Sequence, residues 1–350
     1  MESKVNKILK KLKKKRYMIN EVKKLKENSD EKKIIMFGSP EHGNLGDHAI
    51  SKGELTYFRE NFGQFKVHDI TGPIYRKNRD KIKKYIKDDD IIIITGGGFL
   101  GSLWESEEKM ARNIIEDYKK NQIIIFPSTI YFENNEDGRE EYLESQKIYN
   151  SHSTLKVVAR EGQTEKVLNR MFYENKPERI ISSPDIALYL NEEKEVTRKG
   201  VLLCFRGDKE RVSDGIMEGA SKKINELGIK FKNIDTVIPK EVLIHEREEE
   251  LQKLFDEFRR SKLVITDRLH GMVIAAITGT PCIAFDNLSG KVSGVYKWVE
   301  DIKYIEFLDS IDNLDTTIDH LLNLSETKYP VLKIREQFKE LTTAIEKIVE

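Results

Sequence analysis

Cysteine is scarce in this 350-residue sequence, which has only Cys204 and Cys282 and no CxxC pair. Both cysteines lie in apolar runs, VLLCF and PCIAF, so we expect buried thiols rather than a disulfide scaffold. No apolar run approaches the roughly 20 residues that span a bilayer. The lysine-rich start is not followed by the apolar core and small-residue cleavage site of a secretory signal. These absences predict a cytoplasmic protein.

Net charge is also missing, because 60 Lys and Arg residues balance 60 Asp and Glu residues. We therefore expect no general nucleic-acid-binding surface. Hydrophobic residues make up 38% of the chain and charged residues 34%, which is typical of a globular protein and not of a disordered one. The charge is unevenly distributed, since residues 1–33 contain 13 basic and 5 acidic residues.

Residues 1–30 are predicted to form a basic amphipathic helix. Apolar residues recur at helical spacing along one face while lysines fill the other, and the apolar positions are Val5, Ile8, Leu9, Leu12, Ile19, Val22 and Leu25. Such a helix can bind anionic lipid headgroups as a peripheral membrane contact, here through residues 1–29. It can also pack on its own domain or on a second subunit, and the pattern favours this interpretation.

After Asp30, apolar strands alternate with helical segments, which is typical of parallel sheets covered on both faces. The charged stretch NEEKEVTRK, residues 191–199, interrupts the pattern, which then restarts. We predict an α/β fold with two Rossmann-like domains facing a cleft, at residues 31–190 and 199–325, and a C-terminal helix within 331–350. The strand DDIIIITGGG is expected to stop at its glycines, and 211–227 is expected to be a helix.

Ligands of open parallel sheets bind where strands end and helices begin, so the turns after the strands are candidate sites. The turn GSPEHGNLGDHAI, residues 38–50, contains Asn44, Gly46 and Asp47. Its glycines allow a tight turn and close backbone approach to a ligand. Asp47 suits a catalytic carboxylate or a helix N-cap equally well. His42 and His48, taken singly, favour ordinary polar loop positions.

A second candidate turn is TGGGFLGSLW, residues 95–104, which contains Gly97 and Gly98. Three glycines after four isoleucines permit close contact with a ligand, and a tight turn without a ligand explains them equally well.

Two turns of the second domain deliver arginines to strand ends. VITDRLHG places Asp267, Arg268 and His270 at the start of an apolar helix, where an unpaired buried charge is costly. An anionic ligand explains Arg268, and an ion pair with Asp267 or another acid is the alternative. Arg206 leaves a neighbouring strand, and two guanidinium groups suit a carboxylate or phosphate. Lys291, near the end of a third strand, suits a phosphate contact or a solvated lysine.

Several common sites are missing from the sequence. The turn at 38–50 contains neither GxGxxG nor GxxxxGK[ST], and the sequence contains no HExxH and no GxSxG. The histidines do not pair with acids at the spacing of metal ligands, so we predict no metal site.

Six segments together resemble the polysaccharide pyruvyltransferase family. They occur in the family's order: GNLGDHAI, GGGFLG, VVAREG, SPDIALYL, TDRLHGMVIAAITGTPCIAFDN and GKVSGVY. The resemblance covers residues 34–300, and DRLHG with its following helix is its most specific part. It implies a fold similar to the GT-B glycosyltransferases. It also implies transfer of pyruvate from phosphoenolpyruvate to a sugar as a cyclic ketal, with no cofactor besides this donor.

The resemblance also implies residue roles. Arg268, Leu269 and His270 match the family's Arg-Leu-His donor element, and Arg206 matches its other donor arginine. We expect His270 to transfer a proton or bind phosphate, and Asp47 to act as the base toward the acceptor. The full set of expected substrate contacts is Arg268, Leu269, Arg206, Lys291, Asn44, Gly46, Gly97 and Gly98.

The expected acceptor is a cell-surface or extracellular polysaccharide or its lipid-linked precursor, bound by the first domain while the second binds the donor. One alternative is a glycosyltransferase of the same architecture that uses a nucleotide-sugar donor. Another is a non-catalytic protein that binds anionic glycans or scaffolds a membrane assembly through residues 1–29.

Overall fold

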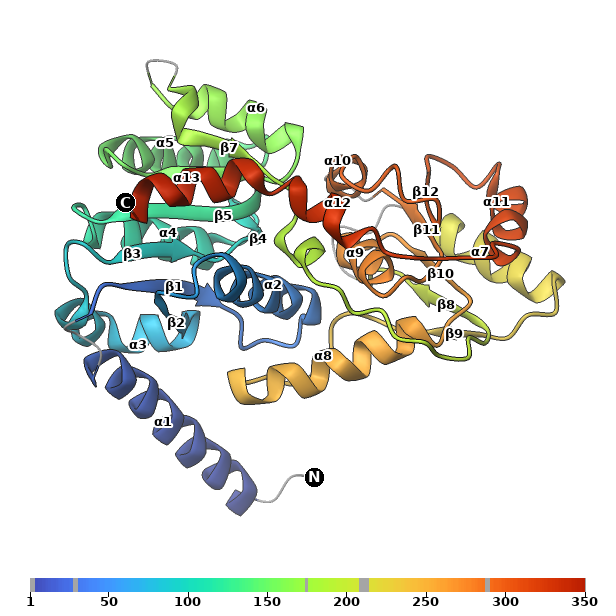
Figure 1. Cartoon of the computed structure of the whole chain (residues 1–350), viewed down its shortest axis with the longest axis horizontal. Helices are drawn as coiled ribbons and strands as arrows, with labels where there is room; N and C mark the ends of the chain where they lie inside the picture. The colour runs from blue at the N-terminus through green and yellow to red at the C-terminus, as the bar shows by residue number, and fades with distance from the viewer. Residues whose placement is uncertain (1–3, 28–30, 174–175, 208–213, 287–289, 350) are drawn as a thin grey trace.

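The chain folds around two parallel β-sheets, which confirms the predicted α/β fold class (Figure 1). The computed structural model describes residues 4–27, 31–173, 176–207, 214–286 and 290–349, and the side chains of 4–11, 13 and 214 are outside this description. The side chains of Val5, Ile8 and Leu9, predicted on the apolar helix face, and the start of the helix predicted at 211–227 therefore lie outside the described residues.

The first sheet has seven strands in the order β2-β1-β3-β5-β6-β7, with β4 paired to β5. Its strands are β1 (Lys33–Ser39), β2 (Lys66–Thr71), β3 (Ile91–Ile94), β4 (Gly97–Gly101), β5 (Gln122–Tyr131), β6 (Lys156–Ala159) and β7 (Ile180–Ser182). The strand predicted before the glycines does stop there, as expected, but the strand β4, which contains Gly97 and Gly98, was not predicted. β3 ends at Ile94, and the chain then turns and pairs with β5 as β4.

Strand alternation explains why the strands are apolar throughout. Ile91 and Ile93 face one side of the sheet and join the core beneath α2, whereas Ile92 and Ile94 face the other side and a second core. Both faces are covered by helices, so both sets of side chains are buried. These helices are α2 (Leu45–Asn61), α3 (Gly72–Ile82), α4 (Glu105–Asp117), α5 (Glu136–Ser151) and α6 (Gly162–Met171), with short 3₁₀ helices η1 (Lys83–Tyr85), η2 (Pro177–Arg179) and η3 (Ile186–Tyr189).

The second sheet has five parallel strands in the order β12-β11-β10-β8-β9. Its strands are β8 (Val201–Cys204), β9 (Phe231–Asn233), β10 (Leu263–Thr266), β11 (Cys282–Phe285) and β12 (Ile305–Leu308), the last of which the sequence did not predict. Its helices are α7 (Asp214–Glu226), α8 (Ile244–Arg259), α9 (Leu269–Ile277), α10 (Lys291–Tyr296) and α11 (Leu314–Leu322). Cys204 and Cys282 are free and buried, as predicted.

The C-terminal segment returns to the first sheet (Figure 1). It forms α12 (Val331–Glu336) and α13 (Lys339–Val349), so the prediction of a single helix within 331–350 was wrong. Leu341 and Ile345 are buried in the core that α2 and α9 share. The Tyr57 hydroxyl and the Thr342 hydroxyl are 2.8 Å apart. The last helix thus ties the end of the chain to the first domain.

The basic N-terminal helix is α1 (Lys4–Glu27). Met18 and Leu25 are buried against the first domain, where Tyr17 and Val22 also pack. Ile19, predicted on the same apolar face, is instead 58% exposed. Packing on its own domain therefore accounts for one side of α1. In the described part of the chain, no helix has an apolar stretch long enough to span a bilayer.

Each sheet has a point where consecutive connections run in opposite directions. In the first sheet β1 lies between β2 and β3, and in the second β8 lies between β9 and β10. Turns at the carboxyl ends of strands that flank such a point form a crevice that favours ligand binding. The turns after β1, β3, β8 and β10 are the four that contain Asp47, Gly97, Arg206 and Arg268.

Candidate active site

The start of α9 holds the Arg-Leu-His segment. The backbone N–H of Arg268 donates to Thr266 Oγ1 at 3.0 Å, which turns the chain from β10 into the helix. A Cβ at Gly271 would lie 2.3 Å from the same oxygen, so only glycine fits this tight connection. Leu269 is buried in the core, whereas His270, one residue further along the first turn, points toward the first domain.

The two arginines predicted to bind the donor, Arg206 and Arg268, occupy neighbouring strand ends. Cys204 and Thr266 pair across β8 and β10, and Arg206 and Arg268 each follow two residues later. The Arg206 backbone N–H donates to Asp267 Oδ1 at 2.8 Å. Burial raises the pKa of Asp267, and this effect exceeds the opposing influence of that bond and of the Arg268 charge.

Arg268 forms an ion pair of 2.7 Å with Asp235 Oδ2. An acid partner was the alternative left open by the sequence, and the structure shows this partner. The pairing is incomplete, however, because Arg268 Nε is buried and has no hydrogen-bond partner among the described residues. Asp235 is itself 39% exposed, so solvent weakens its hold on the guanidinium. Arg268 therefore has both charge and a donor available for an anion.

His270 meets a buried ion pair from the opposite domain. Arg160 Nη1 donates to Asp185 Oδ2 at 2.6 Å, and both side chains are essentially inaccessible to solvent. His270 Nε2 lies 3.4 Å from the same carboxylate oxygen. Burial alone would raise the pKa of Asp185, but His270 and Arg160 outweigh it and lower this pKa to about 2. Asp185 therefore remains an anion beside the imidazole.

Gly46 brings the start of α2 against His270. A Cβ on Gly46 would lie 2.3 Å from His270 Nδ1, so the residue must be glycine for the two helices to meet. Asn44 is the N-cap of α2 and accepts from the Gly46 backbone N–H at 3.1 Å. The N-cap interpretation of Asp47 was therefore wrong. Asp47 lies in the first turn and accepts from the Asn44 amide at 2.8 Å, with His42 at 3.7 Å.

The glycine turn after β3 approaches the same place. Gly97 has φ of +145°, and buried Glu54 accepts from the Gly96 backbone N–H at 2.7 Å. Burial raises the pKa of Glu54 to about 8, although this bond opposes it. A Cβ on Gly98 would lie 3.0 Å from Arg160 Nη2 and 3.7 Å from Lys291 Nζ. Two cationic groups from different domains therefore face the Gly98 backbone.

Arg247 of α8 ties the second domain to β2 and α2 of the first domain. Its Nη1 donates to Asp69 Oδ2 at 2.8 Å, and its Nε donates to His48 Nδ1 at 3.3 Å. Burial and the Arg247 charge lower the pKa of His48 to about 4, so the imidazole is neutral and accepts this bond. His48 is thus a buried structural residue that stabilises the domain interface.

The predicted residues therefore fall into two groups. Gly46, Gly98, His270 and Lys291 meet between the domains, while Arg206 and Arg268 lie at the neighbouring strand ends of the second domain. Sequence reasoning missed Arg160 and Asp185 as site residues. The signal was present, because the first lies in VVAREG and the second in SPDIALYL, two of the segments that carry the family resemblance.

Comparison with known proteins assigns the family. A family model described as Polysaccharide pyruvyl transferase matches residues 44–289. The chain belongs to this family. It is therefore a polysaccharide pyruvyltransferase, an enzyme that transfers pyruvate to a polysaccharide.

Individual relatives match over most of this chain and over most of their own length. General stress protein 30 of Bacillus subtilis is 35% identical over 300 residues, which cover 84% of this chain and 86% of that protein. Pyruvyl transferase 1 of Schizosaccharomyces pombe is 23% identical over 322 residues, covering 85% of this chain and 77% of that protein. A solved structure of a functionally uncharacterized Klebsiella pneumoniae protein has a TM-score of 0.53 at 18% identity, covers 85% of this chain and 98% of that one, and shares the fold.

The contact between Gly46 and His270 predicts a large effect of one methyl group. Gly46→Ala is expected to displace the imidazole, destabilise the enzyme by about 1–3 kcal/mol and lower kcat. Gly162→Ala is the matched control, because Gly162 also lies in the first turn of a helix and a Cβ there meets nothing within 4 Å. Chemical denaturation and turnover of both variants check this, and equal behaviour of the two would refute the contact.

The ionised Asp185 predicts a dependence of stability on pH. Because folding lowers its pKa from 3.8 to about 2, this group stabilises the folded enzyme above pH 3.8, and the stabilisation is lost as the pH falls toward 2. The contribution lost between pH 5 and pH 3 is about 1 kcal/mol. Urea unfolding at these two pH values should show a smaller difference for Asp185→Asn than for the wild type. An unchanged difference would mean that folding does not lower the pKa of this carboxyl group.

Proposed function

We propose that this enzyme takes pyruvate from phosphoenolpyruvate and attaches it, as a cyclic ketal, to a sugar of a cell-surface or extracellular polysaccharide or of its lipid-linked precursor. The observation that carries the proposal is the meeting of His270 with the Arg160–Asp185 pair, Lys291 and the Gly98 backbone between the two sheets. Cations and a proton-carrying group in one place suit a small, densely charged anion.

Donor binding is assigned mainly to the second domain. Arg206 and Arg268 follow the strands that flank its switch point, where anions bind at helix starts. The unpaired Arg268 Nε supports this assignment, since a buried donor without an acceptor costs free energy that an anion would offset. Lys291 adds a further positive charge from the start of α10. The acceptor is assigned to the first domain, beside Asn44 and Asp47.

The proposed reaction balances without a further cofactor, because phosphoenolpyruvate already carries the activated group. A proton adds to the methylene carbon of the donor, which makes the central carbon electrophilic. One sugar hydroxyl adds to that carbon and loses its proton. Inorganic phosphate then leaves, and a second hydroxyl of the same sugar closes the ketal ring and loses its proton in turn. The products are the ketal and phosphate.

Two residues are proposed to move these protons. His270 delivers the proton to the methylene carbon, oriented by the Asp185 carboxylate 3.4 Å from its Nε2. Asp47 takes the proton of the attacking hydroxyl, because it lies in the first turn of α2, one residue after the glycine that contacts His270. Arg268 and Arg206 stabilise the negative charge of the donor and of the leaving phosphate.

A donor competition distinguishes this reaction from sugar transfer. The enzyme is incubated with an acceptor glycan fraction and either phosphoenolpyruvate labelled in its carbon skeleton or UDP-sugars labelled in the sugar. We expect label in the glycan only from phosphoenolpyruvate, together with release of inorganic phosphate. Label from a UDP-sugar instead would identify a glycosyltransferase, and no label from any donor would favour a glycan-binding scaffold.

We also propose that α1 contacts an anionic membrane surface. Its outward face carries two exposed apolar residues, Leu12 and Ile19, each 58% exposed. They alternate with four exposed cations, namely Lys15, Arg16, Lys23 and Lys26. An apolar residue flanked by cations suits the headgroup region of anionic lipid. Each cation near such a surface contributes about 1 kcal/mol.

Sedimentation with vesicles tests the membrane contact. The wild type is expected to sediment with vesicles that contain phosphatidylglycerol and not with neutral vesicles. A variant with Lys15, Arg16, Lys23 and Lys26 changed to glutamine, called the α1 variant, should stay in the supernatant. A variant with the same change at Lys77, Lys81, Lys84 and Lys109, which are exposed on the first domain, is the control. Equal loss of sedimentation in both variants would refute a specific role of α1.

A further inference from the structure

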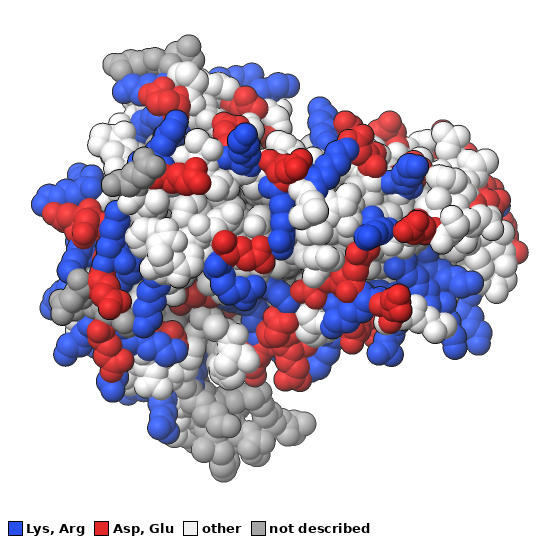
Figure 2. Space-filling view, in the orientation of Figure 1, with Lys and Arg blue, Asp and Glu red and all other residues white. Residues whose placement is uncertain are grey.

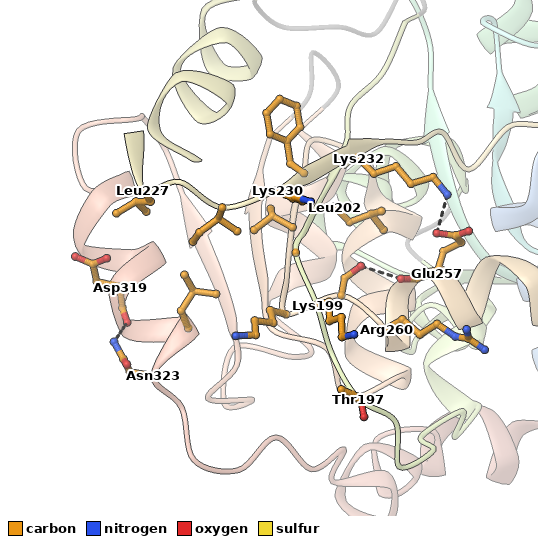
Figure 3. Close-up of a pocket in the computed structure, with 17 residues that line it drawn as sticks. Thr197, Lys199, Leu202, Leu227, Lys230, Lys232, Glu257, Arg260, Asp319 and Asn323 are labelled. Carbon is orange, nitrogen blue, oxygen red and sulfur yellow. Dashed lines mark hydrogen bonds and ion pairs between the residues drawn. The ribbon is translucent and has the colours of Figure 1, made fainter. Parts of the chain in front are cut away.

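A large groove lies at the other end of the second sheet, away from the candidate active site (Figure 3). Its volume is about 1040 Å³, and it is lined by the amino ends of β8 and β9, the loop at 197–200, the end of α8 and one side of α11. Arg206 and Arg268 follow the opposite ends of the strands. Since β8 has four residues, roughly 13 Å of sheet separates the two sites.

The floor of the groove is apolar. Leu202, Leu227, Phe231 and Leu322 contribute to it, and Leu227 is 38% exposed. Contact of these apolar side chains with water is unfavourable. A bound molecule with an apolar face would remove the contact and so gain binding free energy. The pyranose rings of a glycan chain have such faces.

The rim of the groove is strongly basic. Its cations are Lys199, Lys230, Lys232, Arg260 and Lys262, against the two acids Glu257 and Asp319. Figure 2 shows basic side chains gathered at the lower right of the molecule, over the region of β8 and β9. This concentration stands out because the whole chain has no net charge.

Most of these cations have no acid to neutralise them. Lys232 pairs with Glu257 at 2.8 Å (Figure 3). The other four, Lys199, Lys230, Arg260 and Lys262, form no side-chain hydrogen bond or ion pair with the described residues. Backbone bonds hold the rim together, since Lys199 N–H donates to the Arg260 carbonyl at 2.7 Å and Lys262 N–H to the Gly200 carbonyl at 2.9 Å. The backbone of the rim is therefore held by hydrogen bonds, while the charged groups of the four side chains are available to bind a ligand.

We propose that this groove binds a carboxylate-bearing stretch of a glycan chain, namely the pyruvylated part of the enzyme's own product. The proposal rests on the proposed function, because each ketal formed from phosphoenolpyruvate leaves one carboxylate on its sugar. Carboxylates pair with the four unneutralised cations, and the sugar rings cover the apolar floor. The groove is concave, so it fits a chain and not the flat surface of a membrane.

Binding of the product in the groove would affect the order in which sugars are modified. A chain long enough to reach from the active site to the groove would keep a sugar that has already been modified bound while a later one reacts. The enzyme would then bind a modified chain more tightly than an unmodified one, and the modification would proceed along one chain before the next.

Binding of a ready-made acidic glycan tests the groove without requiring turnover. The probe is a fluorescently labelled alginate oligosaccharide, which carries one carboxylate per sugar, and a dextran oligosaccharide of equal length is the neutral comparison. A variant with Lys199, Lys230, Arg260 and Lys262 changed to glutamine, called the groove variant, should bind alginate at least tenfold more weakly than the wild type. All four residues are exposed, so the variant is expected to fold.

The α1 variant is the matched control, since it also loses four positive charges but should keep the alginate affinity of the wild type. Three results would overturn the proposal: equal alginate affinity of the wild type and the groove variant, equal affinity of the wild type for alginate and dextran, or tighter binding of phosphatidylglycerol vesicles or single-stranded DNA through the groove. If phosphoenolpyruvate fails as donor while the groove variant alone loses alginate, the proposed function fails separately from the groove.

Discussion

Arg268→Ala is expected to weaken phosphoenolpyruvate binding at least about 100-fold, because it removes a buried charge that we propose to pair with the donor anion. Arg268 has one unpaired buried nitrogen at the start of α9, so its binding capacity is not used up by Asp235. Isothermal titration of the donor into the wild type and the variant measures the change. Unchanged donor affinity would show that Arg268 has no part in the donor site.

Asp235→Asn is the control that separates binding from folding. If Arg268 served only to pair with Asp235, then Arg268→Ala and Asp235→Asn would change the stability of the enzyme to the same extent, and neither would change its affinity for the donor. We expect instead that Asp235→Asn keeps donor affinity within a few-fold of the wild type, because the guanidinium remains in place. Loss of affinity in both variants would mean that the ion pair itself shapes the site.

His270→Gln is expected to lower kcat by about 10² to 10⁴-fold while donor affinity stays within a few-fold of the wild type. Glutamine keeps a polar side chain of similar length but cannot deliver a proton. The imidazole lies between the Asp185 carboxylate and Gly46, where its orientation is fixed. Turnover with labelled phosphoenolpyruvate and donor titration measure the two quantities separately.

The two roles considered for His270 predict different results. If the imidazole binds phosphate instead of transferring a proton, His270→Gln should lose donor affinity in parallel with Arg268→Ala. If it transfers the proton, its loss should appear in kcat and should remove the pH dependence of kcat that this group causes. Unchanged turnover would exclude both roles.

The sequence predicted the sheets well because their signal is local. Four consecutive isoleucines at 91–94 can be buried only where both faces of a strand are covered, and the structure covers both. The short strand β12 and the break before α13 were missed, since a four-residue strand and a helix interruption leave weak periodic signals. The return of α13 to the first sheet depends on contacts such as Tyr57 with Thr342, which no local pattern shows.

The candidate site was predictable at its strand ends and not across the domain interface. Arg268 and His270 were found because a charged turn before an apolar helix needs an explanation. Arg160 and Asp185 each follow a strand, and in the sequence an ordinary structural ion pair explains them equally well. Only the contact with His270 of the other domain makes them candidate site residues. The Arg247–Asp69 pair likewise joins residues 178 positions apart.

Thermal unfolding of the wild-type enzyme with small anions tests the central claim, that the two sheets together form a site for a three-carbon phosphorylated acid. Phosphoenolpyruvate, inorganic phosphate, pyruvate and UDP are compared at equal concentration, since at a given concentration a ligand that binds the folded state more tightly raises Tm more. We predict that phosphoenolpyruvate raises Tm more than the other three. A larger shift with UDP, or a shift with phosphoenolpyruvate no greater than that with phosphate, would contradict the account.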